Sequence, residues 1–139
     1  MYYKRRIFNA EDSRYEGTFT VDFAVPEFAG DEEGLPPRTM YFLENEFAEI
    51  GSTDNKPLLV TLHGLSGGSH EVYLRCVLKP LVDAGWEACV VNSRGCAGSQ
   101  ITSGILFNGR ATWDIRQCVR WLKRKFPNRP LFGLGFSLG

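Results

Sequence analysis

The pattern of apolar and polar positions along the chain changes near residue 56. Residues 1–25 alternate between apolar and polar, as expected of half-buried strands. Residues 26–56 are rich in proline, glycine and acidic residues, a composition typical of loops, with one short strand expected at 40–43. We therefore predict that residues 1–55 form an N-terminal region of strands and irregular loops.

Three short apolar runs follow, at residues 57–62, 86–91 and 130–135, and each predicts a buried strand. Two segments between them, residues 70–84 and 111–126, have apolar residues at helical spacing. These apolar positions are Tyr73, Cys76, Val77, Leu81 and Ala84 in the first helix and Ala111, Ile115, Cys118, Val119, Leu122 and Phe126 in the second. Strands alternating with helices predict an α/β fold with a mostly parallel sheet flanked by helices. Residues 56–139 are then the first, incomplete part of such a core.

Composition narrows the classes of partner. Sixteen basic residues balance sixteen acidic ones, so no overall charge favours nucleic acid, and we expect no nucleic-acid partner. The four cysteines show no metal-ligand spacing, and we expect neither a metal nor a cofactor. Cys76, Cys89 and Cys118 lie in apolar periodic segments and are expected to be buried, whereas Cys96 lies in a glycine-rich loop.

Neither a long apolar stretch nor the apolar region of a signal peptide is visible in the sequence. Reduced cysteines and the lack of a secretion signal favour an intracellular protein, either cytoplasmic or associated with a membrane.

The strongest chemical motif follows the last predicted strand. Gly135-Phe136-Ser137-Leu138-Gly139 has the form G-x-S-x-G, in which a sharp turn exposes a nucleophilic serine above the sheet edge. An ordinary strand-ending turn is the alternative for so short a motif. Its position directly after a predicted strand favours Ser137 as a catalytic nucleophile.

A second motif, residues 63–69, follows the first predicted parallel strand. In hydrolases of this architecture, one oxyanion donor comes from this loop and another from the residue after the nucleophile. The expected donors are the backbone amides of Leu65 and Leu138, with Gly64 allowing close approach of the backbone. His63 precedes the serine, whereas the general base should follow it, so we assign His63 a structural role. The loop matches neither common nucleotide-binding glycine motif.

A third loop, residues 92–99, follows the second parallel strand. We expect Arg94 to support this loop by binding carbonyl groups or a carboxylate rather than to act in catalysis. Asp114, near the start of the second helix, is a candidate partner. It is a poor triad acid because it also precedes Ser137.

These motifs, together with Tyr73-Leu74-Arg75, resemble the α/β-hydrolase family that includes fungal medium-chain fatty acid ethyl ester synthase/esterases. The resemblance covers most of residues 56–139 and, more loosely, the N-terminal region. It implies a serine esterase or acyltransferase that forms an acyl-enzyme from a medium-chain lipid ester. Water or an alcohol would then be the acceptor, and peripheral membrane contact is left open.

The sequence ends at the expected nucleophile turn, and His63 and His70 both precede Ser137. Family members continue with further strands, an acidic residue and a histidine. We therefore expect the 139-residue chain alone to be inactive and prone to aggregate. Two alternatives stay open: a monoacylglycerol lipase or thioesterase of the same fold, and a non-catalytic, truncated hydrolase-fold protein.

Overall fold

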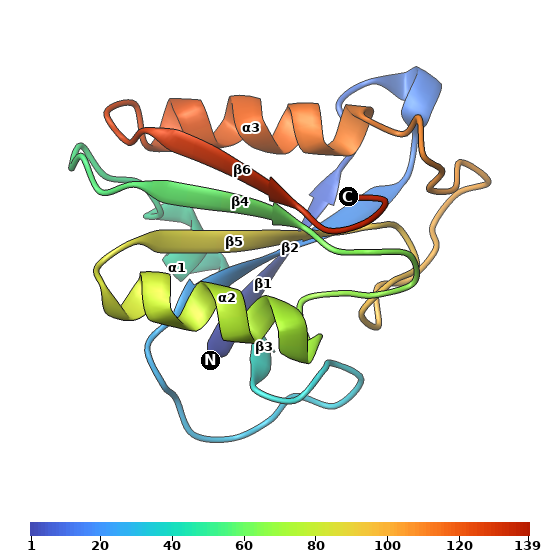
Figure 1. The fold of residues 1–139 in the computed structure, drawn as a ribbon. Helices are drawn as coiled ribbons and strands as arrows, with labels where there is room; N and C mark the ends of the chain where they lie inside the picture. The colour runs from blue at the N-terminus through green and yellow to red at the C-terminus, as the bar shows by residue number, and fades with distance from the viewer.

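The computed structural model describes residues 1–139 as one six-stranded sheet with helices on both faces (Figure 1). The strand order is β3-β1-β2-β5-β4-β6. In chain order the elements are β1 (Tyr2–Asn9), the 3₁₀ turn η1 (Ser13–Tyr15), β2 (Thr18–Val25), β3 (Thr39–Tyr41), α1 (Glu44–Ala48), β4 (Leu58–Leu62), α2 (Val72–Asp83), β5 (Glu87–Asn92), α3 (Trp113–Lys125) and β6 (Leu131–Gly135).

The parallel half of the sheet has the predicted strand–helix–strand–helix–strand order. β4 lies in the middle and pairs in parallel with both β5 and β6. Helices α2 and α3 cover opposite faces (Figure 1). Successive residues of β4 therefore enter different cores: Leu58 and Val60 face α3, and Leu59 faces α2. Burial on both faces explains the continuous apolar run.

The N-terminal strands join the same sheet. β1 and β2 form an antiparallel hairpin, and β2 pairs antiparallel with β5. The strands expected within residues 1–25 are thus present. The short strand expected at 40–43 lies instead at Thr39–Tyr41, and helix α1 after it was not predicted. Five residues are too few to show a helical period, and Phe47 of α1 is held by stacking on Trp121, with ring centroids 5.3 Å apart.

The residues of helix α2 that are buried are not those that its apolar spacing predicts. Leu74 and Leu78, one turn apart, are fully buried against the sheet. Tyr73 and Val77 keep more than a third of their surface, and Cys76 is exposed, so the expectation that Cys76 is buried is wrong. Apolar residues surround much of this helix, so spacing alone did not reveal which stripe meets the sheet.

Helix α3 follows its prediction more closely. Cys118 and Leu122 are fully buried, and the helix ends two residues before Pro127. The strand that follows it, β6, lies at the edge of the sheet and leaves Phe132 47% exposed. The expectation of a buried strand is therefore wrong for β6, because an edge strand has a neighbour on one side only.

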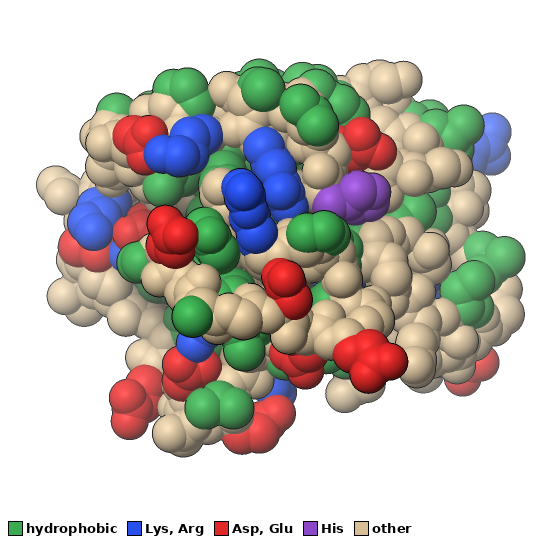
Figure 2. All heavy atoms as spheres, turned by 90° about the horizontal axis from the view of Figure 1, so that it is seen from below, with side chains coloured by type: hydrophobic (Ala, Val, Ile, Leu, Met, Phe, Trp, Pro, Cys, Tyr) green, Lys and Arg blue, Asp and Glu red, His purple; other side chains and the backbone are tan.

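The surface carries charges of both signs. Figure 2 shows basic and acidic side chains interspersed with apolar ones on the face that it presents. None of the helices combines the length and the apolar character needed to cross a bilayer.

Candidate active site

Ser137 lies on a tight turn directly after β6. Its φ is 56°, a left-handed conformation that non-glycine residues rarely adopt, and its side chain is exposed. The turn is closed by a hydrogen bond from the Gly139 amide to the Phe136 carbonyl, 3.0 Å long. Strain of this kind is concentrated at functional sites. The serine therefore has the backbone and the exposure expected of a nucleophile elbow.

The turn packs closely against the end of β4. The Phe136 amide donates to the Leu62 carbonyl at 3.1 Å, and a Cβ on Gly139 would lie only 2.7 Å from that same oxygen. A Cβ on Gly64 would lie 3.6 Å from the Cβ of Ser137. The fold thus brings the loop after β4 beside the serine, as the sequence predicts.

Two backbone amides near the turn are unpaired. The Gly67 amide donates to the Gly64 carbonyl at 3.0 Å and closes a turn that has Leu65 at its tip, with Ser66 at a φ of 57°. Neither the Leu65 nor the Leu138 amide donates a hydrogen bond within the protein. Both residues are exposed, and because their amides have no partner within the protein, these amides stay candidates for binding an external oxygen atom.

His63 is held as a neutral ring. The Ser93 amide donates to its Nε2 at 2.9 Å, which leaves the proton on Nδ1, where the Gly64 carbonyl accepts it at 2.6 Å. Burial lowers the pKa of His63, the hydrogen bond to Gly64 opposing this effect only in part. With both nitrogens engaged, His63 links the loops after β4 and β5 and has no free nitrogen for a substrate.

Tyr73 of α2 is a site residue to which the sequence assigned no role, although it lies in an apolar stripe and in a segment that resembles the hydrolase family. Its hydroxyl accepts a hydrogen bond from the Gly64 amide at 3.0 Å, and its ring packs on Phe136 with centroids 4.9 Å apart. One side chain therefore contacts both the loop after β4 and the serine turn. A tyrosine at the start of the helix after that loop was the available signal.

Arg94 and Asp114 form the pair that the sequence suggested. Nε and Nη2 of Arg94 bind the two carboxylate oxygens at 2.8 and 2.9 Å. The guanidinium also donates to the carbonyls of Tyr15, Glu16 and Ile105. With its side chain only 3% exposed, Arg94 fastens the long loop after β5 to η1 and α3.

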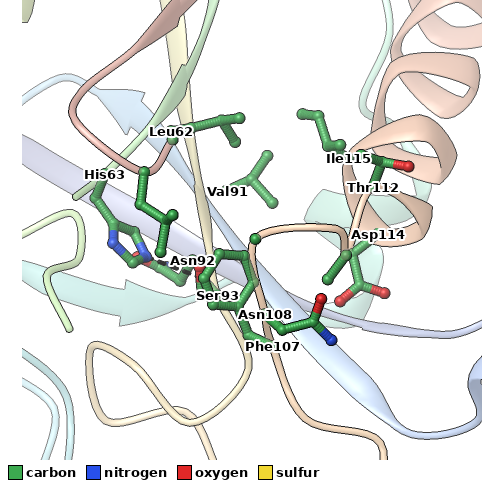
Figure 3. A pocket seen from close by; sticks show the side chains of 14 residues that line it. Leu62, His63, Val91, Asn92, Ser93, Phe107, Asn108, Thr112, Asp114 and Ile115 are labelled. Carbon is green, nitrogen blue, oxygen red and sulfur yellow. Dashed lines mark hydrogen bonds between the residues drawn. The ribbon is translucent and has the colours of Figure 1, made fainter. Parts of the chain in front are cut away.

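A cavity of about 260 Å³ lies between the serine turn and the segment before α3 (Figure 3). Leu62 and Val91 line it from the ends of β4 and β5, Ile115 from α3 and Leu138 from the turn. Ser137 is not among its lining residues, so we do not assign this cavity to the reacting part of a substrate.

The structure contains no group of three or more histidine, cysteine or acidic residues arranged to hold a metal ion. Cys96 offers no activated thiol, because burial raises its pKa.

Three comparisons relate this geometry to known proteins. Residues 57–139 match a family model described as the alpha/beta hydrolase fold. The chain is 40% identical to a monoacylglycerol lipase of Saccharomyces cerevisiae, over 99% of the chain and 33% of that protein. It is 41% identical to medium-chain fatty acid ethyl ester synthase/esterase 2 of the same yeast, over 86% of the chain and 28% of that protein.

Among solved structures, an esterase from Pyrococcus furiosus has the same fold. Its TM-score is 0.63 at 16% identity, and the alignment covers 99% of this chain and 42% of that one. The chain spans about a third of the length of the two curated relatives.

Proposed function

Because the chain belongs to the alpha/beta hydrolase fold family, we propose that it carries the nucleophile and oxyanion donors of a serine ester hydrolase. The observation that carries this proposal is the backbone at Ser137, an exposed serine at a φ of 56° on a turn after a parallel strand. Arg38, Ser66 and Ala97 also have positive φ values, but only Ser137 combines this backbone with the G-x-S-x-G spacing directly after a parallel strand.

In the proposed reaction, Ser137 Oγ attacks the carbonyl carbon of an ester while a general base takes its proton. The amides of Leu65 and Leu138 stabilise the negative charge that develops on the carbonyl oxygen. Collapse of the tetrahedral intermediate releases the alcohol, which takes the proton back, and leaves an acyl-serine. Water then attacks the acyl-serine and releases the acid, with the serine reprotonated.

The base and its acidic partner are proposed to lie outside residues 1–139. His63 has both nitrogens engaged, and Asp114 is bound by Arg94. His70 precedes the serine, whereas this fold places the triad histidine after it. We therefore expect no turnover from residues 1–139 alone.

For the substrate we propose a fatty acyl ester of small-molecule size. The two yeast relatives support this class, one named as a monoacylglycerol lipase and the other as a medium-chain ester synthase/esterase. Their nearly equal identity makes monoacylglycerol hydrolysis a second candidate beside medium-chain ester hydrolysis with transfer to an alcohol. Neither would need a cofactor from the chemistry described.

The test uses the complete protein, extended past residue 139 to the length of its relatives. Hydrolysis of p-nitrophenyl octanoate and of a monoacylglycerol is measured with and without ethanol, and ethyl ester formation is followed by gas chromatography. Ser137→Ala should abolish turnover, and Ser13→Ala, at another exposed serine, should not. Full activity in Ser137→Ala would overturn the proposal, and the substrate panel decides between the two ester classes.

A further inference from the structure

A cluster of buried polar side chains lies beneath the loop after β4, and nothing in the proposed chemistry uses it. Its centre is Asp22 of β2, which is fully buried. The Asp22 carboxylate accepts from Arg5 Nε and Nη2 at 2.6 and 2.7 Å, from Asn92 Nδ2 at 2.8 Å and from the Ser69 hydroxyl. Asn92 and Ser69 are also fully buried, and Arg5 is 1% exposed.

Stability alone gives a weak reason for such a cluster. A buried ion pair must offset the cost of removing both charges from water, and apolar residues of similar volume often serve equally well. This carboxylate binds more than its ion-pair partner, because Asn92 and Ser69 donate to it from two other parts of the chain. The cluster is therefore suited to fixing segments relative to one another.

The segment it fixes is the loop that carries Leu65. Ser69 is held twice: its hydroxyl donates to Asp22, and its amide donates to the Asn92 side chain at 3.0 Å. The other end of the loop is held at Gly64, through Tyr73 and His63. The Leu65 amide thus lies in a short turn between two anchored points.

We propose that Ser69 is a positioning residue for the oxyanion hole, and that the Arg5–Asp22–Asn92 cluster holds it. Through this contact the N-terminal hairpin sets the position of the Leu65 amide. The inference rests on the proposed function, since it assigns the loop the role of stabilising the oxyanion.

The test compares three single variants and one double variant of the complete protein. Ser69→Ala removes only the hydroxyl, so it leaves Asp22 paired with Arg5 and Asn92. Asp22→Asn removes the charge at the centre of the cluster. Thr39→Val is the matched control, because its hydroxyl is equally buried, lies in the N-terminal part of the sheet and has no hydrogen-bond partner.

Ser69→Ala should lower kcat by about 10- to 100-fold with KM changed by less than about twofold, because a displaced donor weakens transition-state binding selectively. The rate at which a fluorophosphonate labels Ser137 should fall in parallel, and Thr39→Val should change neither rate. Because the Ser69 hydroxyl binds Asp22, the two substitutions should not be independent, and the Asp22→Asn/Ser69→Ala double variant should lose less kcat than the product of the two single losses. Thermal unfolding curves confirm that each variant is folded at the assay temperature.

Unchanged kcat and labelling rate in a folded Ser69→Ala would overturn the inference, even if Asp22→Asn fails to fold. So would a loss confined to KM. Ser137→Ala distinguishes a failure of this inference from a failure of the proposed function. If Ser137→Ala abolishes turnover while Ser69→Ala has no effect, Ser137 is still supported as the nucleophile and only the positioning role of Ser69 is refuted.

Discussion

Replacing Tyr73 by phenylalanine tests the contact between helix α2 and the loop after β4. The substitution removes one hydrogen bond, the 3.0 Å contact from the Gly64 amide to the hydroxyl. The ring remains, and with it the packing on Phe136. Because the bond joins two neutral groups and Tyr73 is 37% exposed, its loss should reduce the free energy of unfolding by only about 1 kcal/mol.

The expected effect on catalysis is larger than that on stability. The Leu65 turn would keep its anchor at Ser69 and lose one of the two anchors at Gly64. A displacement of about 1 Å at a reacting group costs up to about 100-fold in rate. Because the turn would keep Ser69 and one of its two anchors at Gly64, we expect only about a tenfold lower kcat, with KM little changed. A tenfold loss corresponds to about 1.4 kcal/mol of transition-state stabilisation.

Tyr41→Phe is the matched control. Tyr41 has the same 37% exposure, and its hydroxyl takes part in no hydrogen bond. Steady-state ester hydrolysis and urea unfolding of the complete protein would be measured for both variants. If Tyr73→Phe retained the kcat of Tyr41→Phe, the tyrosine hydroxyl would not position the loop and the reasoning would be refuted.

Three further predictions concern stability and reactivity. Arg94→Lys should lower the free energy of unfolding by about 3 kcal/mol in urea denaturation, because lysine cannot reproduce the bidentate contact of the buried guanidinium with half-buried Asp114 or its contacts with carbonyl groups. A loss below about 1 kcal/mol would contradict the anchoring role of Arg94. Burial lowers the pKa of His63 in the folded state. The neutral ring therefore stabilises the folded protein fully above the unfolded-state pKa of about 6.5, and this stabilisation is lost as the pH falls toward the lower folded-state pKa. The urea concentration at the midpoint of unfolding should therefore fall as the pH is lowered through this range, and it should fall less steeply in His63→Asn. An equally steep fall in the variant would show that other groups cause the pH dependence. Iodoacetamide at mildly alkaline pH should modify the exposed Cys76 before Cys96, because burial raises the pKa of the Cys96 thiol. Mass spectrometry of early time points would reveal the order, and modification of Cys96 first would contradict these environments.

The sequence was most informative where chain order and local geometry coincide. Ser137, Leu65 and Arg94 each follow a parallel strand, and the carboxyl ends of such strands meet at one edge. The placement of the three loops at one edge of the sheet could therefore be predicted before any contact was known. The Arg94–Asp114 pair was also foreseeable, because a buried arginine requires a partner and the start of α3 offers a carboxylate.

The anchors of the loops could not be predicted in the same way. Asp22 lies in an alternating strand where a charged residue normally faces solvent, and only the pairing of β2 with β5 brings it beside Asn92. The stripe of α2 that meets the sheet was equally ambiguous, because the exposed Val77 is an apolar residue like the buried Leu74. The position of Asp22 depends on a pairing between strands that are distant in the sequence, and the buried stripe of α2 depends on how the helix packs on the sheet. Local periodicity carries no information about either feature.

The arrangement of strain at the site explains why such anchors are needed. Each loop after a parallel strand contains one non-glycine residue at positive φ: Ser66 after β4, Ala97 after β5 and Ser137 after β6. Such residues cost about 1–3 kcal/mol each and persist only where their surroundings hold them. Arg5 Nη1 donates to the Ala97 carbonyl at 2.7 Å while its other nitrogens bind Asp22, which in turn holds Ser69. One buried arginine therefore stabilises two of the three strained loops, so the N-terminal hairpin should be as necessary for the geometry of the site as the strands that carry its residues.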